Sequence, residues 1–148
     1  MKKKINKSFA IISILAIIVT SFVMTAVYYG QIKKQVFSDL KSIADIIAEE
    51  KISGKYLSEV RITEIRDDGT VLYDSEFNEN SLENHINRPE IADALKKGEG
   101  KAVRKSDTLA QSIYYYSKRN EDGTIIRVGK ISQSVNAVML SSFIIVLV

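Results

Sequence analysis

The sequence predicts an α+β fold, in which a membrane helix continues into a long amphipathic helix packed on a five-stranded antiparallel sheet. Three observations lead to this prediction: an uncharged apolar run, an apolar stripe at helical spacing directly after it, and two pairs of β-branched segments joined by Asp-Gly turns. Strands that cluster along the chain, rather than alternating one by one with helices, favour an antiparallel sheet covered by a helix on one face.

Residues 9–29 form the predicted membrane helix. They carry no charge and are numerous enough for the hydrocarbon core of a bilayer, which takes about 20 residues. A cleaved signal peptide is the alternative, but its apolar region usually spans only about 7–15 residues. Lysines without an acid precede the run, so residues 1–8 are expected to be a cytoplasmic basic tail and residues 30–136 to lie outside. These lysines are Lys2, Lys3, Lys4 and Lys7.

The amphipathic helix follows the membrane helix without a break and is expected to end near Ser53-Gly54. Its apolar residues recur every three or four positions. The stripe consists of Ile32, Val36, Leu40, Ile43 and Ile47. Such a stripe either packs on its own domain or forms a parallel seam with a second copy, and we expect a homodimer.

The remaining elements follow from turn and capping residues. Asp67-Asp68-Gly69 predicts the hairpin turn between strands 59–66 and 70–74. Residues 75–87 are polar, which indicates a loop with one helical turn. A short helix is expected to start at Pro89 and to stop at Gly98. The last three strands are predicted at residues 101–105, 109–118 and 124–132.

The last segment, residues 137–148, is almost entirely apolar. Twelve helical residues span only about 18 Å at 1.5 Å per residue, less than a bilayer core. We therefore expect this segment to be the truncated start of a second membrane helix, and the sequence to be the front part of a longer cell-membrane protein.

Charge and composition narrow the possible functions. The net charge is +3, and all 18 acidic residues lie within residues 30–136, which are therefore close to neutral once the lysine tail is set aside. This balance gives no support to nucleic-acid binding. The sequence contains no cysteine, so no disulfide stabilises the outer segment, whose length suits a single domain.

Several short motifs point to a family. They are Asp68-Gly69-Thr70-Val71, Asp74-Ser75, Asn84-His85, Arg88-Pro89-Glu90-Ile91 and Arg104–Thr108. With them, the chain from Lys4 to Val148 resembles the extracytoplasmic PAS-like sensor domain and flanking membrane helices of phosphate-regulon-type sensor histidine kinases. Glu64 departs from the resemblance, because such domains usually carry an apolar residue at this position. The sequence therefore does not determine which residues of the first strand face the core.

The resemblance implies the signal-sensing and transmembrane signal-transduction region of a two-component sensor histidine kinase. The dimerisation domain with its phosphorylated histidine and the ATP-binding domain would follow the second membrane helix. ATP, Mg²⁺ and the response regulator therefore belong to a kinase part absent from this chain, and we expect no catalytic residue and no cofactor here. The input domain of a chemoreceptor and a membrane-anchored binding protein are the alternatives.

The ligand-binding candidates are arginines, tyrosines and one histidine. The resemblance implies a small-molecule pocket between the sheet and the loop with its short helix, and arginine binds carboxylate or phosphate in a bidentate manner, so a small anionic ligand is expected. Alternatively, Arg88 pairs with the internal carboxylate of Asp74 or Glu90. The candidates are Arg88, Arg104, Tyr114, Tyr116 and His85, with Arg127 as a further arginine and Tyr115 as the alternative to the other two tyrosines.

His85 is the only histidine and, by the predicted topology, lies across the membrane from ATP. It is expected either to titrate as a pH sensor or to fasten the loop by a hydrogen bond. One histidine among scattered acids lacks the ligand spacing of a metal site. Asp74 and Ser75 are predicted to form a local side-chain-to-backbone turn, and Pro89 to start a helix.

Overall fold

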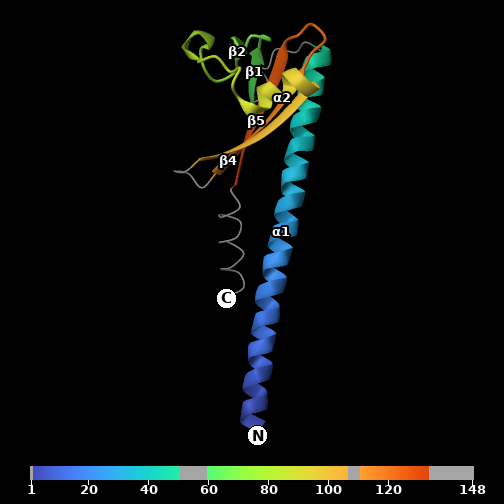
Figure 1. Ribbon diagram of the computed structural model, residues 1–148, viewed down its shortest axis with the longest axis vertical. Coiled ribbons are helices and arrows are strands. Elements are labelled where there is room, and N and C mark those ends of the chain that lie inside the picture. Colours follow the sequence, from blue (N-terminus) through green and yellow to red (C-terminus); the bar gives the residue numbers. More distant parts are fainter. Residues whose placement is uncertain (1, 51–59, 107–110, 134–148) are drawn as a thin grey trace.

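The computed structural model describes residues 2–50, 60–106 and 111–133 (Figure 1). Helix α1 spans Lys2–Glu50 as one uninterrupted rod of 49 residues. Its segment Asn6–Glu49 is long and apolar enough to cross a membrane, with a mean hydropathy of 2.6 in the most apolar window, none of which is buried. The predicted helix end at Ser53-Gly54 and the predicted second membrane helix over residues 137–148 lie outside the described residues.

The strands form a five-stranded antiparallel sheet in the order β2-β1-β5-β4-β3. The predicted α+β class, with a long helix on a five-stranded antiparallel sheet, is therefore confirmed. Strand β5 follows β4 in a hairpin and also pairs with β1, so it is the central strand of the open sheet. The strands are β1 (Arg61–Ile65), β2 (Val71–Asp74), β3 (Glu99–Ser106), β4 (Gln111–Arg119) and β5 (Ile125–Gln133).

Both Asp-Gly segments form the predicted hairpin turns. In the first, the Gly69 N–H donates to the Arg66 carbonyl at 2.9 Å, and the Asp68 carboxylate accepts the Thr70 N–H at 2.9 Å. In the second, the Asp122 carboxylate accepts the Thr124 N–H at 3.0 Å. Aspartate thus stabilises each turn with its own side chain, as its preference for turns predicts.

Between β2 and β3 the chain forms the 3₁₀ turn η2 (Glu79–Ser81) and helix α2 (Pro89–Lys97). Pro89 lies in the first turn of α2, as predicted, where its missing N–H has no helical partner to lose. Gly98 ends the helix in a left-handed conformation with φ of 85°, and its N–H donates to the Ala94 carbonyl at 2.9 Å. Both predicted helix boundaries are therefore confirmed.

The two helices cover opposite faces of the sheet. The outer end of α1 lies along one face, and α2 lies on the other (Figure 1). On the α1 face, Leu40 and Ile47 of the predicted stripe are buried against the sheet, while Val36 and Ile43 pack at the margin of the same core. The alternative in which the stripe packs on its own domain is therefore confirmed for these residues. The sheet side of this core consists of Ile62, Tyr114, Tyr116, Ile126 and Val128.

A candidate ligand site on the α2 face of the sheet

The α2 face buries an arginine at its centre. Arg127 lies in the middle of β5, between Ile126 and Val128, which both belong to the α1-face core. Because successive side chains of a strand point to opposite faces, Arg127 faces α2. It is only 1% exposed, and its Nε–H donates to Oε1 of Glu90 at 3.0 Å.

Glu90 links this arginine to a second one. It lies in the first turn of α2, is fully buried, and also accepts hydrogen bonds from Nη2 of Arg104 on β3, at 3.0 and 3.3 Å. The carboxylate can reach the sheet because α2 approaches β3 closely at Gly100, where an added Cβ would overlap the Glu90 carbonyl. Glu90 therefore occupies a position between two guanidinium groups.

Tyr115 completes the charged layer from β4. The Cζ atom of Arg127 lies 3.8 Å from the centre of the Tyr115 ring, and that of Arg104 lies 5.0 Å from it. Cation–π contacts of this kind favour a charged guanidinium over the ring face. Space for the ring comes from Gly129, which is paired with Tyr115 across the strands.

Three buried side chains on this face have polar atoms without hydrogen-bond partners among the described residues: Arg127 at Nη2, His85 at both ring nitrogens, and Ser117, opposite Arg127 on β4, at Oγ. Burial lowers the pKa of His85 to about 4, and the nearby positive charges of Arg88 and Arg127 add to the effect. Burial also lowers the pKa of Arg127 to about 10, against the opposing charge of Glu90. At neutral pH the layer therefore holds a charged arginine and a neutral histidine, both with unsatisfied polar atoms.

Arg88 lies at the edge of the same layer and is half-buried. Burial and the charge of Arg104 both lower its pKa, although the carboxylate of Glu90 opposes them. Within the described part of the chain, Arg88 has no carboxylate of its own, because Glu90 is paired with Arg104 and Arg127. Two arginines thus share the Glu90 carboxylate, and Arg88 beside them adds a positive charge that could attract an anion.

The prediction that Arg88 pairs with Asp74 or Glu90 is wrong. Asp74 pairs instead with Arg61, with 2.9 Å between the Arg61 Nη2 and Asp74 Oδ2 atoms. Strand pairing explains this choice, because Thr63 lies opposite Asp74 and Arg61 follows on the same face of β1. Sequence reasoning missed Arg61, although its spacing from Asp74 within a predicted hairpin was a usable signal.

Asp74 and Ser75 have the predicted structural roles. The Asp74 carboxylate accepts the N–H groups of Glu76 and Phe77 at 3.0 and 3.1 Å, which closes a local turn after β2. Burial alone would raise the pKa of Asp74, but these bonds and Arg61 lower it overall. The hydroxyl of Ser75 accepts the Ile62 N–H at 3.0 Å, which fastens the turn to β1.

Tyr114 and Tyr116 lie on the α1 face rather than at the candidate site. They are 0% and 1% exposed, within the core under α1. The Tyr114 hydroxyl lies 3.1 Å from that of Tyr29, and the Tyr116 hydroxyl donates to Glu99 at 2.6 Å. Tyr114 and Tyr116 therefore lie away from the arginines, and Tyr115, the stated alternative, is the tyrosine that meets them.

His85 lies at the candidate site, but its ring does not fasten the loop. The loop is held by the His85 backbone N–H, which donates to the Gly69 carbonyl at 2.8 Å, and by the Asn84 side chain, which donates to the Asp68 carbonyl at 2.9 Å. The predicted hydrogen bond thus belongs to the backbone and to the neighbouring asparagine. Burial of an unpaired imidazole has no structural explanation among the described residues.

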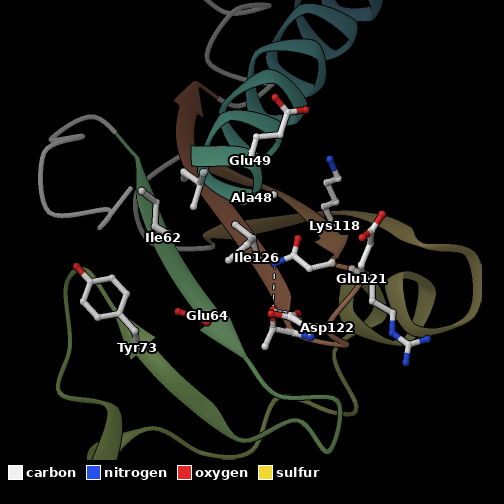
Figure 2. A pocket seen from close by; sticks show the side chains of 13 residues that line it. Ala48, Glu49, Ile62, Glu64, Tyr73, Lys118, Glu121, Asp122 and Ile126 are labelled. Atoms are coloured by element: carbon white, nitrogen blue, oxygen red, sulfur yellow. Dashed lines mark hydrogen bonds between the residues drawn. The ribbon is translucent and has the colours of Figure 1, made fainter. Parts of the chain in front are cut away.

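A cavity of about 890 Å³ lies on the α1 face, where α1 ends beside the β4–β5 turn (Figure 2). Glu64 of β1, Glu49 of α1 and Tyr73 of β2 are among the residues that line it. Glu64 is half-exposed, which explains why a charged residue is tolerated in this register. The carboxylates around this cavity reach solvent, whereas Arg127 and Glu90 on the α2 face are buried, so the α2 face is the stronger candidate for a functional site.

Comparison with known proteins found no matching family model and no matching curated protein. The described residues contain no group of three histidines or carboxylates able to hold a metal ion. The candidate site thus consists of charged and polar side chains, namely Arg88, Arg104, Arg127, Glu90 and His85.

Proposed function

We propose that this chain is the extracytoplasmic signal-sensing and transmembrane signal-transduction region of a two-component sensor histidine kinase. The observation that carries the proposal is that strands β4 and β5 supply residues both to the charged layer and to the core under α1. On β4 and β5, residues of the charged layer alternate with residues that pack on the helix leading toward the membrane.

This alternation couples the two faces mechanically. Tyr115 lies between Tyr114 and Tyr116, and Arg127 lies between Ile126 and Val128. A shift of β4 or β5 that accommodates a ligand on the α2 face must therefore also move the core residues under α1. Packed interfaces of this kind respond by small rigid displacements rather than by continuous deformation.

The long helix supplies the route to the membrane. Tyr29 at the end of the apolar run touches Tyr114 of β4, and Phe37 makes an edge-to-face contact with the same ring at 5.6 Å between centroids. Farther out, Asp45 accepts a hydrogen bond from Lys118 at 2.6 Å. Contacts at both ends of the packed segment allow α1 to move with the sheet as a unit.

The ligand class suggested by the site is a small carboxylate or phosphate. Glu90 already occupies the fork between Arg104 and Arg127 as such an anion would, and the remaining positive charge lies at Arg88. An external anion would bind by sharing or displacing the Glu90 carboxylate. Signalling would require that it binds one arrangement of the helices more tightly than the other.

Topology is the first test. Single cysteines at Lys3 and Glu79 in intact cells should differ in reaction with a membrane-impermeant maleimide. The proposal expects labelling at Glu79 only, because the lysine tail stays inside. Labelling at Lys3 alone would overturn the extracytoplasmic placement.

The second test measures signal transfer. The chain is fused to the cytoplasmic kinase part of a well-characterised sensor histidine kinase, and phosphotransfer to its response regulator is followed in membranes. Arg127→Met should shift the basal output several-fold, whereas Lys96→Gln on the exposed side of α2 should leave it unchanged. Equal output from both variants and the parent would contradict a sensing role for the charged layer.

The third test concerns the ligand. Thermal unfolding of the full chain is measured against a panel of carboxylates, phosphates and amines, in the parent and in Arg104→Ala. The proposal expects at least one anion to raise the melting temperature of the parent and to lose most of this effect in the variant. If only amines raise the melting temperature, or if an anion raises it equally in both proteins, the site does not bind an anion through Arg104.

A further inference from the structure

A second groove lies where α1 leaves the apolar run. It has a volume of about 790 Å³ and is walled by α1 on one side and by β3 on the other. Its lining combines apolar side chains with four exposed lysines. These residues are Phe37, Ala102 and Val103, together with Lys33, Lys34, Lys41 and Lys101.

Most of the positive charge in this groove is not neutralised. Lys41 pairs with Glu99 at 3.1 Å, but Lys33 and Lys34 form no ion pair within the described part of the chain. The Lys101 ammonium group lies 5.9 Å from the centre of the Phe37 ring, so the cation is held beside the apolar wall. Uncompensated cations next to aromatic and aliphatic side chains match an amphipathic anion better than a freely hydrated one.

The position of the groove points to the source of that anion. Gly30, which lines the groove, directly follows the apolar run that ends at Tyr29. At 1.5 Å per helical residue, Lys33 and Lys34 lie about 6–8 Å beyond the run. The head-group layer on each side of a bilayer is about 5–8 Å thick, so both lysines stand at its outer edge, where their long side chains can reach the lipid phosphates.

We propose that this groove binds the phosphate head group of an anionic phospholipid. Lys33, Lys34 and Lys101 surround the phosphate, and Phe37 and Val103 form the apolar wall of the groove beside the head group. A lipid bound in this way would bridge α1 and β3, and would fix the domain at a defined height and angle on the membrane. The inference rests on the proposed membrane span and is independent of the ligand site on the α2 face.

The test uses the full chain in lipid nanodiscs of phosphatidylcholine, with or without about one fifth phosphatidylglycerol. Lysines are acetylated with an N-hydroxysuccinimide ester, and the modification is quantified by mass spectrometry. Lys33, Lys34 and Lys101 should be protected several-fold in the anionic discs, and this protection should be lost at 1 M salt, where the Debye length is about 3 Å. Lys96 and Lys97 on α2 provide internal controls that should react equally in both discs.

A matched pair of variants makes the result specific. Lys34→Gln/Lys101→Gln should bind phosphatidylglycerol about 10- to 30-fold more weakly in native mass spectrometry. Lys96→Gln/Lys97→Gln removes the same charge elsewhere and should bind as the parent does. Equal protection in both kinds of disc, or equally weakened lipid binding in both variants, would contradict lipid binding in this groove.

Other occupants would also be revealed. If inorganic phosphate in neutral discs protects the lysines as strongly as the anionic lipid does, the groove binds a free anion and not a lipid. If the protection of the lysines rises with the number of chains per disc, a second copy of the chain covers the groove. Failure of the chain to co-elute with the discs would refute the membrane span itself, which separates that outcome from a failure of the groove alone.

Discussion

The two faces of the sheet bury different chemistry, although the same strands supply both. The α1 face buries Leu40, Ile62 and Val128 with two tyrosines in an apolar core. The α2 face buries Arg127, Glu90 and His85 at 0–1% exposure beside a small apolar cluster around Ile91. One face thus resembles an ordinary protein interior, and the other holds charges that an interior usually excludes.

The buried groups of the two faces contribute differently to stability. Each fully buried aliphatic side chain on the α1 face contributes about 1.5–3 kcal/mol. Buried ion pairs, in contrast, lose about as much in desolvation as they gain in attraction, and unsatisfied polar atoms cost more. Stability alone therefore does not explain the α2 face, which is why we propose it as a ligand site.

The largest expected effect comes from removing the carboxylate of the charged layer. Glu90→Leu leaves Arg127 buried without a counter-charge and should lower the free energy of unfolding by about 3–5 kcal/mol. Glu90→Leu/Arg127→Met removes both charges and should recover most of that loss. Urea unfolding of the full chain in detergent micelles measures both. A loss below about 1 kcal/mol in the single variant would show that the pair is not sealed.

On the α1 face the matching change is Leu40→Ala. Leu40 is fully buried, so the cavity and the lost burial should cost about 3 kcal/mol by the same measurement. Ile46→Ala on the same helix is the control, because Ile46 is 50% exposed and should cost less than about 0.5 kcal/mol. Similar losses at both positions would mean that α1 does not pack on the sheet by this face.

A third change tests the position of α2 on the sheet without altering any charge. Gly100→Ala forces a methyl group against the Glu90 backbone and should cost about 2 kcal/mol by pushing α2 away from β3. Gly30→Ala inserts the same methyl group in α1, where no atom lies within 4 Å, and should instead stabilise by about 0.5–1 kcal/mol. A neutral Gly100→Ala would contradict the close approach that brings Glu90 to the arginines.

The smallest effect is the pH dependence that His85 imposes. Its pKa is lowered to about 4 in the folded chain, from an ordinary value of 6.5, because the buried ring disfavours the charged form. The unfolded chain therefore binds a proton first as the pH falls, and stability should decrease by about 1–2 kcal/mol between pH 6.5 and pH 5. His85→Gln should flatten the profile in this window. An unchanged slope would show that His85 titrates normally.

Local signals in the sequence predicted most of the fold. The Asp-Gly turns placed both hairpins, and Pro89 and Gly98 bounded α2, because these residues act through their own backbone preferences. The face on which each tyrosine lies could not be predicted, since three successive tyrosines satisfy either register. Likewise, the partner of each arginine depends on strand pairing: Glu90 and Arg127 are 37 residues apart, and only the folded sheet brings them together.

The most direct test of the account uses the single histidine as a probe. The full chain in micelles, labelled with ¹³C and ¹⁵N in histidine and arginine, is titrated with a panel of small carboxylates and phosphates. The account predicts that at least one anion shifts the His85 ring and Arg127 Nε–H signals with a common Kd, and that Arg88→Gln/Arg104→Ala weakens this response at least tenfold. If no anion shifts either signal, or if the double variant responds like the parent, the charged α2 face is not a ligand site.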